Sequence, residues 1–245
     1  MDSTTLRSVI LAVGIAGGGL LGGMGFARGR EADRFVTVKG VTEREARADL
    51  AIWPLHLVGT DNDLTAAHAK LQRSIVGVRQ FLQRHGIDTT QAELTGFSVS
   101  DASTNQFAGA TERGSRFVIR QTLIVRSSKP EQVLAASQQI GELAAVGVVI
   151  SSGSGGEFGG SGSGPTFVFT GLNKLKPPMI AESTQRAREA AEQFARDSRT
   201  ELGGIRHASQ GIFEILPRDQ AQGITEESQI AKIVRVVTTV EYFLK

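Results

Sequence analysis

The spacing of apolar and polar residues predicts three amphipathic helices, of which the clearest runs over residues 62–85. Apolar side chains recur there every three or four positions, which places them on one face of a helix. These positions are Leu64, Ala67, Leu71, Ile75, Val78 and Leu82. Asp61 and Asp63 are signals for the start of a helix, and Gly86 followed by Ile87 predicts a Schellman stop.

A second helix is predicted over residues 129–146. Ser128 and Glu131 have the spacing of a capping box at its start, and Gly147 is expected to end it. The third helix is predicted over residues 179–202, with Gly203 and Gly204 following its last turn. Its apolar stripe consists of Ala187, Ala191, Phe194 and Leu202.

Other segments alternate apolar and polar residues with a period of two, as half-buried strands do. Strands are expected over residues 35–40, 44–58, 92–100, 104–111, 115–126, 148–151, 165–170, 205–216 and 230–244. In the second of these, Ala46, Ala48, Leu50 and Ile52 occupy the apolar positions, and Leu55 and Leu57 take over after Pro54. A proline at a change of phase predicts a bulge or an edge position.

The strands come mostly in pairs between the helices. This order predicts an α+β fold, with mostly antiparallel sheet packed by about three helices, rather than a doubly wound parallel sheet. Residues 35–245 are expected to form this domain, with a Gly/Ser-rich loop at 151–164. That loop has almost nothing to bury and matches neither a phosphate-binding loop nor a nucleophile elbow, so it is interpreted as a flexible insertion.

Residues 8–27 carry no charge, and Arg7 and Arg28 flank them. Twenty helical residues span about 30 Å, the hydrocarbon thickness of a bilayer. The sequence therefore predicts one N-terminal transmembrane helix over residues 8–28, an uncleaved signal-anchor. A short cytoplasmic tail at 1–7 precedes it and a linker at 29–34 follows it.

The glycines of this segment permit two further interpretations. Gly14, Gly18 and Gly22 share one helix face and would let two membrane helices pack closely, although glycine is also simply common in such segments. Gly17, Gly19 and Gly22 match the dinucleotide-binding pattern, but the following residues, 20–27, lack the polar face that the helix of this motif needs.

Composition narrows the possible chemistry. The chain has no cysteine, which excludes disulfides, thiolate catalysis and cysteine-ligated metals. The 27 Lys and Arg side chains nearly balance 25 Asp and Glu without a basic run, so nucleic-acid binding is not expected. The histidines are scattered without metal-ligand spacing, at positions 56, 68, 85 and 207. We therefore expect no catalytic residue, no cofactor and no metal site.

The order of these segments resembles the SIMPL-domain family, bacterial envelope proteins of largely unknown function. Residues 35–40 resemble the opening strand of the family, which ends in glycine, and residues 47–53 its second strand, with Ala48 where proline is usual. Residues 82–88, 94–100 and 116–125 are similar to its next blocks, with Phe117 in place of a common tyrosine. Residues 187–204 and 233–243 are similar to its late helix and closing strand.

The resemblance implies an exported, often oligomeric α+β domain, in some members forming channel-like rings, with a loose link to envelope stress defence. It supplies no catalytic residue. The expected function is a membrane-anchored, extracytoplasmic, self-associating structural or binding protein of the cell envelope. The alternatives are an anchored enzyme whose site is assembled from dispersed residues and, less favoured, a dinucleotide-binding enzyme.

The expected location is the inner (cytoplasmic) membrane, crossed once, with the main domain periplasmic. The flanking charges argue against this orientation, because Arg28, Arg30 and Arg34 outnumber Arg7 and the terminal amine. The early position of the apolar segment and the resemblance favour export.

Overall fold

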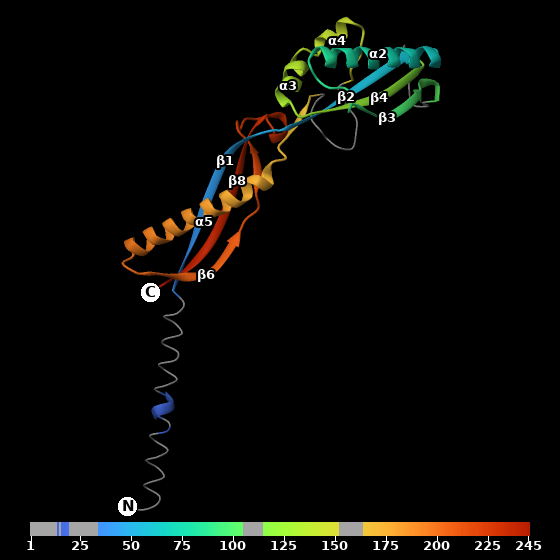
Figure 1. Ribbon diagram of the computed structural model, residues 1–245. Coiled ribbons are helices and arrows are strands. Elements are labelled where there is room, and N and C mark those ends of the chain that lie inside the picture. The colour runs from blue at the N-terminus through green and yellow to red at the C-terminus, as the bar shows by residue number, and fades with distance from the viewer. Residues whose placement is uncertain (1–13, 15, 20–33, 105–114, 152–163) are drawn as a thin grey trace, which may run out of the picture. The chain divides into compact units, whose positions relative to one another are not determined.

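The computed structural model describes residues 14, 16–19, 34–104, 115–151 and 164–245, and the chain divides into two compact units (Figure 1). Unit 1 comprises residues 1–43, 175–214 and 235–245, and unit 2 comprises residues 44–174 and 215–234. Each unit has a sheet with helix packed against it. Both sheets contain antiparallel strand pairs, so the α+β class with antiparallel sheets is confirmed.

Unit 2 contains a four-stranded sheet in the order β3-β4-β2-β5. Its strands are β2 (Leu50–Asp61), β3 (Glu93–Asp101), β4 (Phe117–Ser127) and β5 (Thr166–Val168). The helices of this unit are α2 (Leu64–Arg84), α3 (Pro130–Gln138) and α4 (Gly141–Ala145), with short 3-10 turns η1 (Ala102–Thr104) and η2 (Glu226–Ser228). Helix α2 runs along β2 and β4 and covers one face of the sheet (Figure 1).

The core of unit 2 lies between this sheet face and α2. From the helix, Leu71, Val78 and Leu82 are completely buried, as their spacing predicts, whereas Leu64 at the start of the helix is exposed. From the sheet, Trp53 and Leu123 are also completely buried. The predicted helix face is therefore confirmed except at its first position, Leu64.

Both ends of α2 confirm the sequence signals. The Asp63 side chain accepts a hydrogen bond from the Ala66 N–H (2.8 Å), which caps the first turn. Gly86 has φ +71°, and the Ile87 N–H donates to the Leu82 carbonyl (2.9 Å), as a Schellman motif requires. Only glycine adopts this backbone without strain, which is why the helix ends there.

The helix predicted over residues 129–146 is divided in two, α3 and α4. The capping box is wrong, because the Oγ of Ser127, not Ser128, accepts a hydrogen bond from the backbone of Lys129, at 3.1 Å. Gly147 ends α4 as expected, with φ +78°. The break at Gln139 and Ile140 adds a helix to the three expected.

The break between the first two strands lies later than predicted. β1 (Phe35–Arg47) continues through residues 41–43, and only Ala48 and Asp49 separate it from β2. In β2 the fully buried positions are Ala51, Trp53, Leu55 and Leu57, so Leu50 and Ile52 lie on the opposite face. Both faces of this strand are apolar, and only the position of α2 decides which is the core face.

Pro54 causes no bulge, since β2 pairs with β4 without a register shift from Ala51 to Asp61. The edge interpretation is wrong for the strand as a whole, because β2 lies between β4 and β5 in the sheet, and β5 pairs with Leu50–Ile52, before Pro54. His56 accepts a hydrogen bond from Ser151 (2.9 Å) and Val58 donates one to Val149 (3.4 Å), both on the edge away from β4. Backbone N–H and C=O groups of successive residues point to opposite sides of a strand, so the nitrogen of Pro54 also points away from β4. The missing N–H of proline therefore costs no hydrogen bond to β4.

Unit 1 contains most of a sheet with the strand order β1-β8-β6, where β6 is Leu202–Gln210 and β8 is Ala231–Leu244. β7 (Glu214–Pro217), which also pairs with β8, belongs to unit 2 except for its first residue. The Leu244 N–H donates to the Arg34 carbonyl (2.9 Å), which places the start of β1 beside the end of β8. Helix α5 (Leu172–Asp197) packs on one face of this sheet. The core cluster consists of Val36, Ala187, Ala191, Val240 and Tyr242.

Helix α5 begins earlier and ends earlier than the predicted 179–202. It includes Pro177 and Pro178, its sixth and seventh residues, which lie beyond the first turn, so each removes an intrahelical hydrogen bond there. It ends at Asp197 because Arg199 adopts φ 55°, and the Thr200 N–H then bonds to the Ala195 carbonyl (2.9 Å). The two glycines expected to stop the helix lie instead in β6.

Several predicted segments fall outside the described residues. These are the membrane span at 8–28 except residues 14 and 16–19, the linker up to residue 33, most of the strand predicted at 104–111, and residues 152–163 of the Gly/Ser-rich loop. Within the part of the chain that the structure describes, no helix is both long and apolar enough to cross a membrane.

Candidate functional site

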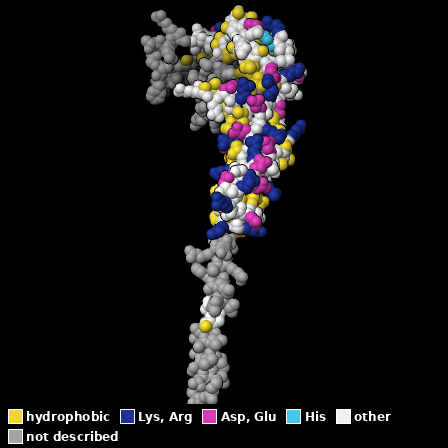
Figure 2. Space-filling view, turned by 90° about the vertical axis from the view of Figure 1, so that its left-hand side faces the viewer, with side chains coloured by type: hydrophobic (Ala, Val, Ile, Leu, Met, Phe, Trp, Pro, Cys, Tyr) yellow, Lys and Arg dark blue, Asp and Glu magenta, His cyan; other side chains and the backbone are white. Residues whose placement is uncertain are grey.

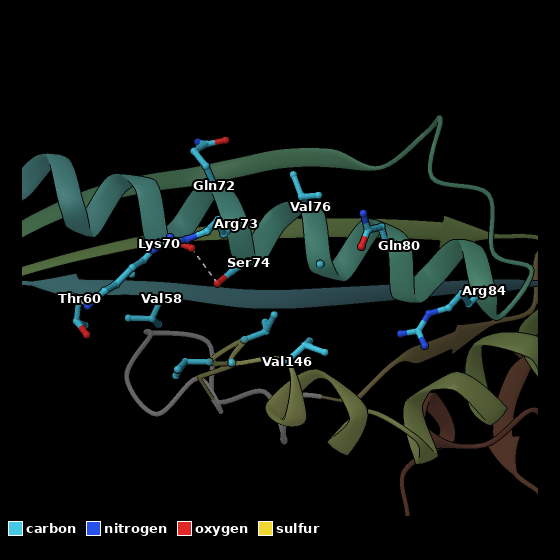
Figure 3. A pocket seen from close by; sticks show the side chains of 15 residues that line it. Val58, Thr60, Lys70, Gln72, Arg73, Ser74, Val76, Gln80, Arg84 and Val146 are labelled. Carbon is cyan, nitrogen blue, oxygen red and sulfur yellow. Dashed lines mark hydrogen bonds between the residues drawn. The ribbon is translucent and has the colours of Figure 1, made fainter.

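A groove of about 830 Å³ lies in unit 2 beside α2 (Figure 3). One wall is the helix from Lys70 to Arg84, and the other is the segment 146–149 with the end of β2 at residues 58–60. The segment 146–149 approaches the helix closely because position 77 is glycine: a Cβ there would lie 3.2 Å from the Val148 side chain. Val148 is buried by this approach.

Three valines give the groove an apolar rim. Val76 on the helix is 54% exposed, and Val146 and Val149 on the opposite wall are 64% and 60% exposed. The turn at Gly147 separates the two valines of that wall. Exposed apolar side chains on both walls of one groove mark a surface that can take up an apolar partner.

Three cations also line the groove, and they differ in how far they are already bound. The Lys70 ammonium lies 2.7 Å from the Asp61 carboxylate and donates to the Thr60 carbonyl at 3.1 Å. The hydrogen bond from Lys70 lowers the pKa of Asp61 below its usual range. Arg84 lies 3.6 Å from Glu142. Arg73 has no ion-pair partner among the described residues, so its guanidinium is the one best able to bind an anion.

The described lining of the groove contains no histidine and no carboxylate. Its exposed valines and its cations can bind a chain that combines aliphatic groups with negative charge. The described residues also contain no group of three His, Asp or Glu side chains arranged for a metal ion.

None of the four histidines is among the lining residues, although His68 contacts Gln72, which is one of them. His56 bonds to Thr122 across two strands (Nδ1 to Oγ1, 3.0 Å), and His68 lies 3.3 Å from Gln72 on α2. The His85 ring packs on Phe81 at the end of the helix, with its Nε2 3.7 Å from a Glu142 oxygen, beyond hydrogen-bond reach.

The glycine face predicted to pack membrane helices is described in part. Gly14 and Gly18 are helical, and a Cβ at either would meet nothing within 4 Å. Gly22 lies outside the described residues, so packing through this face stays a prediction.

Strand alternation did not identify the edges of the unit 1 sheet, which depend on strand order. In the order β1-β8-β6, β1 and β6 are the outer strands. Residues 204–210 of β6 are exposed along their length. Their polar sequence is typical of any solvent-exposed strand. Only the strand order shows that one side of the β6 backbone pairs with β8 and that the other side faces away from it.

The comparisons with known proteins identify a family but no activity. A family model described as SIMPL, protein of unknown function (DUF541), matches residues 36–240. No curated protein matches the chain. The solved structures that match include two with low sequence identity and TM-scores too low to indicate a shared fold. A hydrolase from Listeria innocua is 10% identical over 80% of this chain and 90% of its own, with a TM-score of 0.21. An uncharacterized conserved protein from Listeria innocua is 13% identical over 80% and 91%, with a TM-score of 0.20.

Proposed function

The chain belongs to the SIMPL family, and we propose that it is a membrane-anchored module outside the cytoplasm that self-associates and binds a partner without catalysing a reaction. The family itself is of unknown function, and the surfaces of this chain support self-association, anchoring with export, and binding.

The observation that carries self-association is the pair of outer strands in unit 1. Strands β1 and β6 each have one strand neighbour, β8, among the described residues. From His207 to Gln210, β6 pairs regularly with β8, so its backbone groups on the other edge are aligned for a further strand. An outer strand of this kind is a template for pairing with a second copy of the chain.

Cysteine cross-linking tests this, because the chain has no cysteine of its own. We would make Lys39→Cys on β1, Ser209→Cys on β6, the double variant, and Glu189→Cys on the exposed side of α5 as control. A short bismaleimide links cysteines on adjacent strands, whose Cβ atoms lie about 5 Å apart. Dimers from Ser209→Cys alone indicate two-fold pairing of β6, and dimers only from the double variant indicate pairing of β1 with β6.

Cross-linking no greater than that of Glu189→Cys, together with a monomer mass for the full chain in detergent by sedimentation, would overturn self-association.

Anchoring is supported by residues 8–27, an uncharged run of the length that spans a bilayer, and an apolar run of this kind can also direct export. Alkaline phosphatase fused after Lys245 would be active if the domain is exported. Inactive phosphatase, with bright fluorescence from a cytoplasm-only reporter at the same site, would place the domain in the cytoplasm.

Binding is supported by the groove of unit 2, whose exposed valines and Arg73 suit an acidic, aliphatic peptide. A dye-labelled peptide of alternating Asp and Val serves as the probe for the full chain. Arg73→Glu should weaken its binding by about fivefold, the loss of one exposed ion pair. Arg188→Glu, on the exposed side of α5, should leave it unchanged. Equal effects of the two variants would show that the groove is not the binding surface.

A further inference from the structure

One end of the unit 1 sheet combines exposed aromatic rings with cations. Phe35 begins β1 and is 41% exposed, and Phe243 near the end of β8 is 36% exposed. Val36 and Tyr242, the adjacent residues, point into the core under α5. Because side chains alternate along a strand, both phenylalanines lie on the face of the sheet that α5 does not cover.

Arg206 of β6 joins this face. Its guanidinium lies 4.0 Å from the centre of the Phe35 ring and 3.5 Å from the Glu241 carboxylate. An arginine stacked on an exposed ring presents an apolar surface together with donors for an anion. We refer to Phe35, Arg206 and Phe243 as the aromatic end.

More cations than anions surround the aromatic end. The Arg34 carbonyl accepts a hydrogen bond from Leu244, and Lys245 and Glu201 exchange backbone hydrogen bonds at 2.9 and 3.1 Å, so these residues meet at the strand ends. Arg199 lies two residues before Glu201. Beside the paired Arg206 and Glu241, these strand ends therefore carry three basic residues, Arg34, Arg199 and Lys245, and one acidic residue, Glu201. Figure 2 shows Lys and Arg side chains beside Asp and Glu side chains at the lower end of the described part.

The chain itself leads from this end to the apolar run. Residues 8–27 are uncharged, and only residues 28–34 separate them from Phe35. Seven extended residues reach at most about 25 Å, whatever conformation they take. If residues 8–27 lie in a bilayer, the aromatic end therefore stays within that distance of its surface.

We propose that the aromatic end rests on the lipid headgroups of the membrane that holds residues 8–27, with the two phenylalanines in the interface and the cations on lipid phosphates. This inference rests on the proposed anchoring. Aromatic and basic side chains are the ones enriched at the headgroup level, and cations close to the surface favour anionic lipid. The contact would orient the whole of unit 1, and with it the two outer strands, relative to the membrane.

Spin labelling tests the contact on the full chain. Thr37→Cys places a label on β1 two residues from Phe35 on the same face, and Glu189→Cys places one on the exposed side of α5. Both proteins are reconstituted into vesicles of phosphatidylcholine with phosphatidylglycerol. We expect collisions of the Thr37 label with a water-soluble nickel complex to fall at least about twofold relative to the Glu189 label, and less so in phosphatidylcholine alone.

Two serine variants supply matched controls. Phe35→Ser with Phe243→Ser should restore the nickel access of the Thr37 label, while Phe194→Ser, which removes an exposed ring of α5, should not. Equal nickel access at both labelled sites, or equal effects of the two sets of variants, would overturn the inference.

Flotation of the wild-type protein with the vesicles is measured in the same preparations. Flotation without protection of the label leaves the anchor and removes the headgroup contact, whereas loss of flotation overturns the anchor as well.

Discussion

Gly40 on β1 lies so close to Ser183 on α5 that a Cβ at Gly40 would be 1.8 Å from the Ser183 carbonyl oxygen and 2.7 Å from the Ala187 nitrogen. The obstructing atoms are helix backbone, which cannot rotate away as the end of a side chain could. On the same helix, the Ser183 hydroxyl is 2.6 Å from the Thr238 hydroxyl of β8. Helix and sheet are therefore in direct backbone contact at Gly40.

Gly40→Ala should destabilise unit 1 by at least about 3 kcal/mol, since the methyl group must push the helix off the sheet. Gly204→Ala is the control in the same unit, because a Cβ there meets nothing within 4 Å. It should change the free energy of unfolding by no more than about 0.5 kcal/mol. Urea unfolding followed by circular dichroism measures both, and similar losses would refute the contact.

Lys232, whose side chain is fully buried, bonds to the carboxylate of Glu226 and to its carbonyl oxygen at 2.6 Å. Glu226→Gln leaves the ammonium buried without a counter-charge and should cost about 3 kcal/mol or more. Lys232→Met removes the buried charge itself, leaves a carboxylate that water reaches, and should cost less. Unfolding followed by the fluorescence of Trp53, the single tryptophan, compares them. The reverse order would contradict the buried ion pair.

Asp101 and Arg116 predict a pH dependence of stability. The hydrogen bonds from Arg116, and then those from Ser103, lower the pKa of Asp101 from 3.8 to about 2 in the folded protein. A carboxyl with a lowered folded pKa stabilises the fold above its unfolded pKa and loses this effect as the pH falls towards the folded value. Asp101→Asn should therefore be less stable than wild type above pH 4, with the difference vanishing towards pH 2.

Stability curves from pH 2 to pH 7 check this. Arg116→Gln should remove most of the same pH-dependent difference, because it removes the main donor. A difference between wild type and Asp101→Asn that persists unchanged at the acid end would rule the mechanism out.

The Gly/Ser-rich segment interrupts one edge strand of unit 2. Ile150 pairs with Leu57, and Thr166 pairs with Ile52 further along the same edge of β2. If the strand that contains Ile150 continued without interruption, its residue 155 would lie opposite Ile52. Thr166 lies opposite Ile52 instead, so eleven extra residues separate the two pieces of the strand.

Deleting residues 153–163 should therefore join the two pieces in register and change the free energy of unfolding by no more than about 1 kcal/mol. Pro165 would then lie opposite Trp53, with its nitrogen directed away from β2. Deleting residues 152–163, one more, shifts the register by one and should cost more, because the side chains of the joined strand exchange faces. Thermal unfolding of both variants decides it. Equal losses would show that the two pieces do not share one edge.

Leu71 and Leu64 test the core face of α2. Leu71→Asp buries an unpaired carboxylate where the side chain is completely enclosed and should cost more than about 3 kcal/mol. Leu64 is 44% exposed, so Leu64→Asp should cost less than about 1 kcal/mol. Trp53 fluorescence during urea unfolding reports both. Comparable losses would mean that the stripe is assigned to the wrong face.

Local patterns identified the elements whose signals are themselves local. Asp63 and Gly86 bound α2 where the sequence places its ends, because a cap and a left-handed glycine act within one turn of helix. The helix end predicted at Gly203 and Gly204 was wrong, because the end of α5 and the start of β6 depend on more than local signals. A non-glycine, Arg199, adopts the left-handed backbone at the end of α5, and packing of the Leu202–Gln210 strand on β8 supplies what local propensity does not.

The candidate surfaces could not be read in the same way. The groove joins Val76 to Val146 and Val149, which are far apart in the chain and brought together by the close approach at Gly77. The aromatic end likewise joins Phe35, Arg206 and Phe243 from three strands. The residues next to each of these side chains in the sequence do not indicate which other side chains it meets in the fold.

By itself, the sequence determined the class of fold, the ends of α2, the apolar run at 8–27 and the membership of a family, because each depends on the periodicity, the capping or the order of segments along the chain. Only the tertiary structure decided which face of β2 is buried, which strands are outermost, and which exposed side chains meet. Those properties depend on where α2, α5 and the neighbouring strands pack, and packing joins residues that the sequence holds far apart.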